Sequence, residues 1–141
     1  MTTEFVYDFI RKHNLAVLST LSGEKQPEAA LVAIAVTEDL EIIFDTVKSS
    51  RKYQNLLRNP LVALVIGWDN ETTLQYEGTA IELKNTDDDN FLKEIYFAAF
   101  KDGRERAEIW PDIVHFKIIP NWVRYSNFNV PVLIKEMTAP F

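Results

Sequence analysis

The seven residues from Thr46 to Lys52 are the part of the sequence best suited to binding an anion. They carry three hydroxyls and three cations, namely Thr46, Ser49 and Ser50 with Lys48, Arg51 and Lys52. Arg51 and Lys52 fall in the first turn of a predicted helix, where a cation is unfavourable by roughly 0.3–1 kcal/mol. A bound anion reverses that sign, because backbone N–H groups, hydroxyls and cations then all point at it. The pattern predicts a phosphate site; a solvated basic helix start is the alternative.

The flanking residues predict the elements that would hold this turn. Leu40 to Asp45 has the period of two that is typical of a strand. Ser49 or Ser50 is a good N-cap for the helix that follows. Asn59 and Pro60 end that helix, and the apolar run 61–66 has the length of a strand.

This segment resembles the flavin-contacting segment of the pyridoxamine 5′-phosphate oxidase-like split barrels, which bind FMN. The matching pattern is FDTxxxSRKxxNLxxNPxVxL, and the resemblance covers about residues 15–125. In that family the second strand runs along the flavin ring, and a later strand contributes polar contacts to the flavin of the partner subunit. Carried over to this sequence, the resemblance implies these cofactor-binding residues: Ala30, Leu31, Val32, Ala33, Asp45, Thr46, Ser50, Arg51, Lys52, Thr73, Gln75 and Tyr125.

Several of these assignments have structural alternatives. The small side chains of the second strand also suit a packed helix, Thr73 and Gln75 suit a solvated strand face, and Tyr125 suits a core equally well. The sequence also departs from the family on the second strand. The pyridoxamine phosphate oxidases carry an arginine at about Ala30, and its absence removes one phosphate or ring contact.

Composition excludes several classes of function. At 141 residues the chain is expected to be one domain, residues 1–141. A net charge of −6 argues against a nucleic-acid partner or an anionic membrane. There are no cysteines and two histidines, so no metal site is predicted. No apolar run reaches membrane-spanning length and the first residues lack a signal-like core, so a cytoplasmic protein is expected.

The remaining periodicity predicts a mainly β chain with peripheral helices. Strands are expected at 15–21, 27–36, 72–84, 113–119 and 122–126, and helices at 3–13, 86–101 and 104–110. The strand at 27–36 is apolar on both faces, which predicts that both are buried. Gly78 predicts a bulge or a close backbone approach. Short hairpin connections favour an antiparallel barrel, closed or half open, because closure removes edge strands. The resemblance implies the same architecture, an antiparallel split β-barrel.

The sequence shows no catalytic constellation of side chains, which fits a protein whose cofactor does the chemistry. The resemblance implies non-covalently bound FMN and a homodimer with the cofactor site shared between subunits. We therefore expect a flavin-dependent oxidoreductase acting on an unidentified small molecule. The alternatives are a non-catalytic flavin-, deazaflavin- or haem-binding module, and a structural dimer that has lost the cofactor.

The last fifteen residues argue against one activity of the family. The characterised oxidases grip pyridoxal phosphate with a cationic motif near the C-terminus. Residues 127–141 contain one lysine, one glutamate and no arginine or histidine. A doubly charged phosphate substrate needs cationic partners, so we predict that the protein is not a true pyridoxamine phosphate oxidase.

Overall fold

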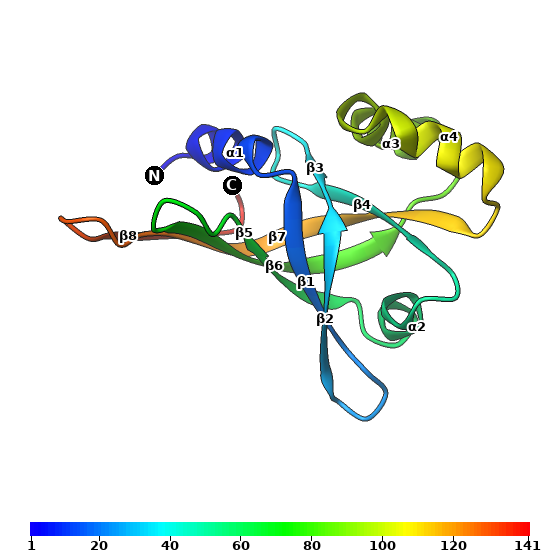
Figure 1. Ribbon diagram of the computed structural model, residues 1–141, viewed down its shortest axis with the longest axis horizontal. Helices are drawn as coiled ribbons and strands as arrows, with labels where there is room; N and C mark the ends of the chain where they lie inside the picture. The colour runs from blue at the N-terminus through cyan, green and yellow to red at the C-terminus, as the bar shows by residue number, and fades with distance from the viewer.

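A computed structural model describes residues 1–141 as a curled antiparallel sheet with helices around it (Figure 1). The elements in chain order are α1 (Thr3–Lys12), β1 (Leu15–Leu21), β2 (Pro27–Ala33), β3 (Ala35–Val36), β4 (Ile42–Val47), α2 (Arg51–Arg58), β5 (Leu61–Ile66), β6 (Thr72–Glu82), α3 (Asp87–Ala99), α4 (Lys101–Ile109), β7 (Ile113–Asn127) and β8 (Leu133–Thr138). Across the sheet the strands run β2-β1-β5-β6-β7-β4-β3, and β8 pairs with β7. The predicted split barrel is confirmed.

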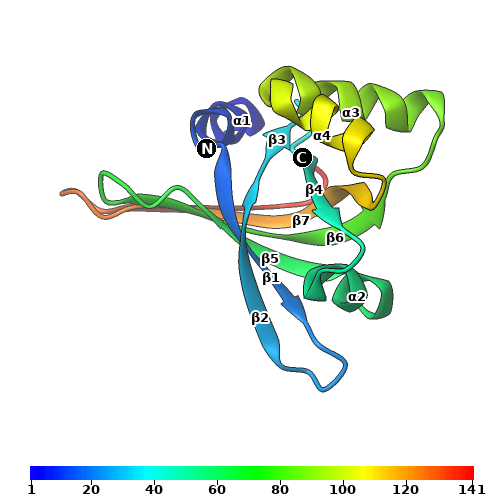
Figure 2. The same cartoon turned by 45° about the vertical axis from the view of Figure 1, so that its right-hand side comes forward.

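The curl follows from the way β2 continues into β3. β2 lies at one end of the strand order and β3 at the other, yet only Ile34 separates them. The Ile34 N–H donates to the carbonyl oxygen of Asn14 at 2.9 Å instead of joining a ladder. The two edges of the sheet therefore meet at this residue. Elsewhere they diverge, and β6, β7 and β8 extend as an arm away from the curl (Figures 1 and 2).

The main core lies inside the curl. Every second residue of β1, β5 and β6 points into it, and α1 adds Val6 and Ile10. Tyr76 on β6 is fully buried, and its hydroxyl donates to the carbonyl oxygens of Leu40 at 2.8 Å and Ile118 at 3.0 Å. Because an unpaired buried hydroxyl is costly, these two bonds tie β6 to the residues around β4 and β7.

The opposite face of β3 and β4 is covered by α3 and α4 (Figure 2). A small second core forms there, with Ala35, Ile43, Leu83 and Tyr96 buried. The apolar side chains of α3 therefore pack partly inside the chain. One large side chain of this helix, Phe91, is 67% exposed.

Two expectations about the strands near the candidate site are corrected. The prediction that both faces of the second strand are buried is wrong, because β2 lies at the edge of the sheet and Leu31 is 61% exposed. The next strand begins at Ile42 and not at Leu40, because Leu40 has a φ of 65° and lies in the preceding turn. This strand extends to Val47, so Thr46 belongs to a strand and not to the turn.

Three further boundaries differ from the sequence-based expectation. The helices predicted at 86–101 and 104–110 are present as α3 and α4, but they meet at Phe100, and Gly103 lies inside the second helix and not between the two. β7 runs unbroken through Pro120, and the segment after Asn127 contains β8, a strand that periodicity did not indicate. The prediction for Gly78 is confirmed: the β6–β7 register shifts there, and a Cβ at Gly78 would lie 2.5 Å from the carbonyl oxygen of Ile119.

Candidate functional site

The hydroxyls of the candidate phosphate site come together at the start of α2. Ser50 is the N-cap, and its Oγ accepts from the N–H of Tyr53 at 3.2 Å. The Oγ of Thr46, at the end of β4, lies 2.9 Å from the same Ser50 oxygen. The N–H groups in the first turn of a helix have no intrahelical partner, and α2 has no acidic residue there to complement them. The local sequence thus builds an electropositive helix start.

A pocket of about 130 Å³ adjoins this helix start. Its walls come from β1, β2 and α2, and the lining residues are Leu18, Thr20, Glu28, Ala29, Ala30, Arg51 and Lys52. Ala30 therefore lines the same pocket as Arg51 and Lys52. A longer side chain at this position of β2 would point toward Arg51 and Lys52, which is where the missing family arginine would act.

Lys52 is the cation of this pocket that lacks a partner. Its side chain is half-buried, and it forms no ion pair within 4.0 Å, whereas Arg51 does. Burial lowers the pKa of the Lys52 ammonium, and the negative charge of Asp45 opposes that shift. A desolvated ammonium without an anion beside it is unfavourable, and a bound anion would relieve this.

Glu28 is a site residue that the sequence did not indicate. Its Oε2 lies 3.0 Å from Nη1 of Arg51, and its Oε1 accepts from Nδ2 of Asn55 at 2.8 Å. The Glu28 side chain is only 17% exposed, while that of Arg51 is 76% exposed. In the sequence Glu28 is an ordinary polar residue after a proline. The sequence contains no signal for Glu28. It belongs to the site because it accepts from Asn55, and the burial of Asn55 is evident only in three dimensions.

Four of the predicted cofactor-binding residues lie on the outer face of the sheet, away from this pocket: Leu31, Ala33, Thr73 and Gln75. Val17 on β1 pairs in register with Leu31 on β2 and Val65 on β5, and Val65 pairs with Gln75 on β6. Strand alternation puts Ala33 and Thr73 on this same face. We call Val17, Leu31 and Val65 the outer apolar row; all three are exposed, at 37%, 61% and 39%.

Val32 and Tyr125 are buried in the main core. They are 6% and 8% exposed. The Tyr125 ring makes edge contacts with Phe5, at a centroid distance of 4.9 Å, and with Phe9, at 5.4 Å. Within one chain the structure thus brings Ala30, Thr46, Ser50, Arg51 and Lys52 together, and Tyr125 is not among them. The role of Tyr125 as a cofactor contact stays a prediction.

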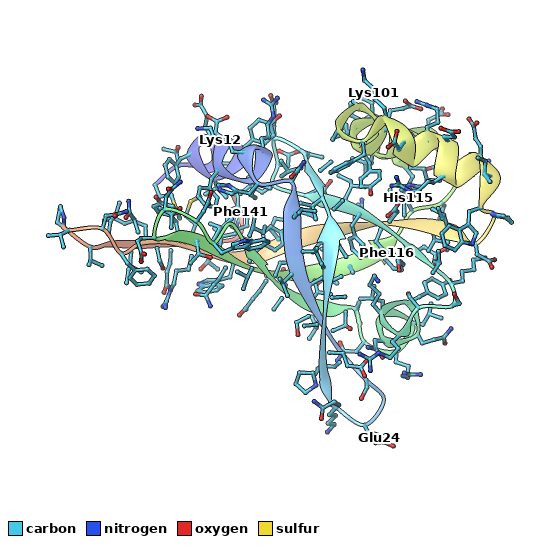
Figure 3. The ribbon with its side chains drawn as sticks, in the orientation of Figure 1. Lys12, Glu24, Lys101, His115, Phe116 and Phe141 are labelled. Carbon is cyan, nitrogen blue, oxygen red and sulfur yellow. The ribbon has the colours of Figure 1, made fainter.

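Asp45 faces away from Thr46, toward the helices α3 and α4. It pairs in register with His115 on β7, and its Oδ2 lies 3.5 Å from Nη2 of Arg106. Three buried polar atoms in this cluster have no hydrogen-bond partner: Oδ2 of Asp45, Oη of Tyr96 and Nε2 of His115. Figure 3 shows His115 below these helices. Burial lowers the pKa of His115, Asp45 opposes this, and Lys93 and Arg106 reinforce it.

The chain matches the model of a known family over most of its length. The family described as pyridoxamine 5′-phosphate oxidase matches residues 2–127, so the chain belongs to that family. The pyridoxine/pyridoxamine 5′-phosphate oxidase of Cyanothece sp. is 32% identical over 84 residues, which are 59% of this chain. The match covers only 39% of the length of that curated relative.

Solved structures with the same fold extend the comparison. A heme binding protein from Mycobacterium smegmatis superposes with a TM-score of 0.82 at 15% identity, covering 98% of this chain and 58% of that one. General Stress Protein 26 from Bacillus anthracis gives a TM-score of 0.70 at 22% identity, covering 96% of this chain and 98% of that one. At these identities the likeness establishes the fold alone.

The chain has neither a membrane-spanning helix nor a cluster of metal-binding side chains. The longest helices are too short and too polar to cross a membrane. No three side chains among His, Cys, Asp and Glu are grouped so that they could hold a metal ion.

The buried His115 predicts a pH dependence of stability. Its pKa is lowered in the folded state from the ordinary value of 6.5, so the unfolded chain binds the proton more readily. The stability associated with the neutral imidazole is therefore present above about pH 6.5 and is lost as the pH falls through the folded pKa. The groups that face His115 are Asp45 from β4, Lys93 and Tyr96 from α3, and Arg106 from α4.

Denaturant unfolding between pH 7.5 and 5 should show a smaller decline in His115→Gln than in the wild type. An NMR titration of the imidazole should place the His115 midpoint below 6.5. A midpoint above that value, or equal pH slopes in the two proteins, would contradict the expectation.

Proposed function

We propose that this chain binds FMN, with the phosphate of the cofactor at the start of α2. The residues that would hold the phosphate are Lys52, Arg51, Ser50 and Thr46, together with the free N–H groups of the first helical turn. The half-buried and unpaired ammonium of Lys52 is the observation that carries this proposal. The donor set also fits the group, since hydroxyls, cations and helix N–H groups all favour a phosphate dianion.

The size of the pocket limits what it holds. Sites that enclose a small molecule usually measure about 300–1,000 Å³, whereas this pocket measures about 130 Å³. It is therefore suited to the phosphate end, and the flavin ring would lie outside it, along β2. In this proposal a second copy of the chain covers the ring and completes the site as a two-fold homodimer. The outer apolar row supports this, because it leaves apolar side chains of three neighbouring strands in solvent.

In the proposed activity the protein is a flavin-dependent oxidoreductase acting on a small molecule. When bound, FMN would supply hydride and electron transfer. The residues of the chain would bind the phosphate, orient the ring along β2 and exclude water between subunits. We do not propose a pyridoxamine phosphate oxidase activity. Residues 127–141 offer no cationic clamp, because Lys135 is their sole cation and Glu136 is engaged by Arg124.

Haem is the second candidate ligand, because one structure with the same fold is described as a heme binding protein. Both histidines of this chain are poorly placed to ligate an iron. His115 is 5% exposed. The ring nitrogens of His13 lie 2.8 Å from the carbonyl oxygen of Phe9 and 3.2 Å from Oδ1 of Asp69. The geometry therefore favours flavin over haem with a histidine ligand, and deazaflavin remains a chemically similar alternative.

Neutralising Lys52 should weaken FMN binding. Lys52→Met keeps most of the side-chain volume and removes one charge-assisted interaction, worth roughly 1.5–3 kcal/mol or about 10- to 100-fold in affinity. Titration of FMN by fluorescence quenching measures the change. Lys48→Met is the matched control, since Lys48 is exposed in the same turn. Equal losses in both variants, or none in Lys52→Met, would exclude Lys52 as the phosphate ligand.

The proposed redox function predicts a spectrum and its bleaching. Freshly purified protein, or protein incubated with FMN, should show the absorption of bound oxidised flavin, which is distinct from that of haem. Addition of NADPH or NADH under anaerobic conditions should bleach it. Incubation of the FMN-loaded protein with pyridoxamine phosphate and oxygen should give no turnover at ordinary enzyme rates. A haem spectrum, or rapid pyridoxamine phosphate oxidation, would reject the proposed activity.

The homodimer is tested by placing a charge in the outer apolar row. Val17→Glu puts a carboxylate at the centre of that row and should convert a dimer into a monomer, because a buried unpaired charge is very unfavourable. Sedimentation at micromolar concentration measures the mass. Ile109→Glu on α4 is the control, because Ile109 is 73% exposed and lies away from this face. A wild-type monomer that binds flavin would contradict the shared site.

A further inference from the structure

We propose that Glu28 determines the ligand specificity of the α2 site by competing with a phosphate for Arg51. This inference rests on the proposed flavin site and adds a prediction about it. The site should favour FMN, which carries a phosphate dianion, over riboflavin, which carries none, by a smaller factor than it would without the Glu28 carboxylate. Glu28 is then a specificity-determining residue, and its carboxylate occupies a position that an incoming phosphate would otherwise use.

The first support is where the carboxylate lies. Glu28 lines the 130 Å³ pocket together with Arg51 and Lys52. It also lines a second pocket of about 290 Å³, whose lining residues are all polar or charged and include Arg51. Its Oε2 is 3.0 Å from Nη1 of Arg51. An anion entering either pocket therefore approaches a carboxylate as well as a guanidinium, and the like charge opposes it.

The second support is that Glu28 is held firmly while Arg51 is not. Asn55 is 2% exposed. Its Nδ2 donates to Oγ1 of Thr20 at 2.9 Å and to Oε1 of Glu28 at 2.8 Å. Moving the carboxylate out of the way would break a buried hydrogen bond. The Arg51 side chain is 76% exposed and is free to turn toward a ligand, but this movement would break its ion pair with Glu28.

The charges in the pocket only partly match those of a phosphate. Arg51 and Lys52 contribute two positive charges and Glu28 contributes one negative charge, so one net positive charge faces a ligand. A phosphate monoester carries close to two negative charges near pH 7. Lys52 alone would be fully available to it. The opposite possibility is that Glu28 positions Arg51 for the phosphate, in which case removing the carboxylate should weaken FMN binding.

The experiment compares FMN and riboflavin in matched variants. Glu28→Gln keeps an oxygen that can accept from Asn55 and removes the charge. It should raise the affinity for FMN by about 10-fold or more and leave that for riboflavin unchanged. Glu24→Gln is the control for net charge, because Glu24 lies at the exposed tip of the β1–β2 hairpin (Figure 3). Glu28→Ser, which removes the carboxylate altogether, serves if Glu28→Gln does not fold.

A second measurement does not depend on flavin. Inorganic phosphate should raise the melting temperature of Glu28→Gln more than that of the wild type or of Glu24→Gln. An unchanged or lower ratio of FMN to riboflavin affinity, or an equal response to phosphate, would overturn the role of Glu28. If no variant binds flavin, the proposed function fails, and the phosphate response still decides whether Glu28 excludes anions from this site.

Discussion

One buried amide, that of Asn55, fixes the geometry on which the candidate site depends. It lies on α2, and its two N–H donors reach Thr20 on β1 and Glu28 on β2. Leaving such a donor unpaired in a buried position costs about 1–3 kcal/mol, so the helix has a strongly preferred orientation against the two strands. That orientation turns the first residues of α2, Arg51 and Lys52, toward the edge of the sheet. Without that orientation Lys52 would lose the partial burial that leaves its ammonium unfavourable in the absence of an anion.

The start of α2 is electrostatically unfavourable without a ligand, and a bound anion would therefore be stabilised there. α2 carries two cations and no acid in its first turn, against the direction that its dipole favours. Glu28 offsets part of this by pairing with Arg51, but it leaves Lys52 partly desolvated and unpaired. The structure therefore holds a local excess of positive potential in a chain whose net charge is −6. An anion is the simplest group that would remove this excess.

The parts of the fold that short-range rules determine were predictable. β1 has the predicted limits, Ser50 is one of the two expected caps, and β5 has the predicted limits. Each depends on residues within one turn or on a local apolar run. Thr46, Ser50, Arg51 and Lys52 lie close together for the same reason, since all four fall within seven residues, and their role as a phosphate site stays a prediction.

The remaining features depend on neighbours that are distant in the chain. The apolar pattern of β2 is the same for a central strand as for an edge strand, and only the final strand order separates the two cases. Glu28 becomes part of the site because Asn55, 27 residues later, reaches it. β8 is mostly exposed and shows no alternation in its burial, so its pairing with β7 left no period to detect. Tyr125 is covered by Phe5 and Phe9 from the opposite end of the chain.

The open edge of the barrel, at β2, lies between the two groups of predicted cofactor-binding residues, one at the start of α2 and the other on the outer face of the sheet. Ala30 lines the 130 Å³ pocket with Arg51 and Lys52, whereas Leu31, the next residue, points to the outer face with Gln75. A ligand that contacts both groups must therefore run along the free edge of β2, where the backbone is unpaired and three of the side chains are alanines. Small side chains and free backbone donors and acceptors suit a flat, polar-edged ring. A fully closed barrel would have paired this edge, so the open side of the sheet is what makes the proposed flavin site possible.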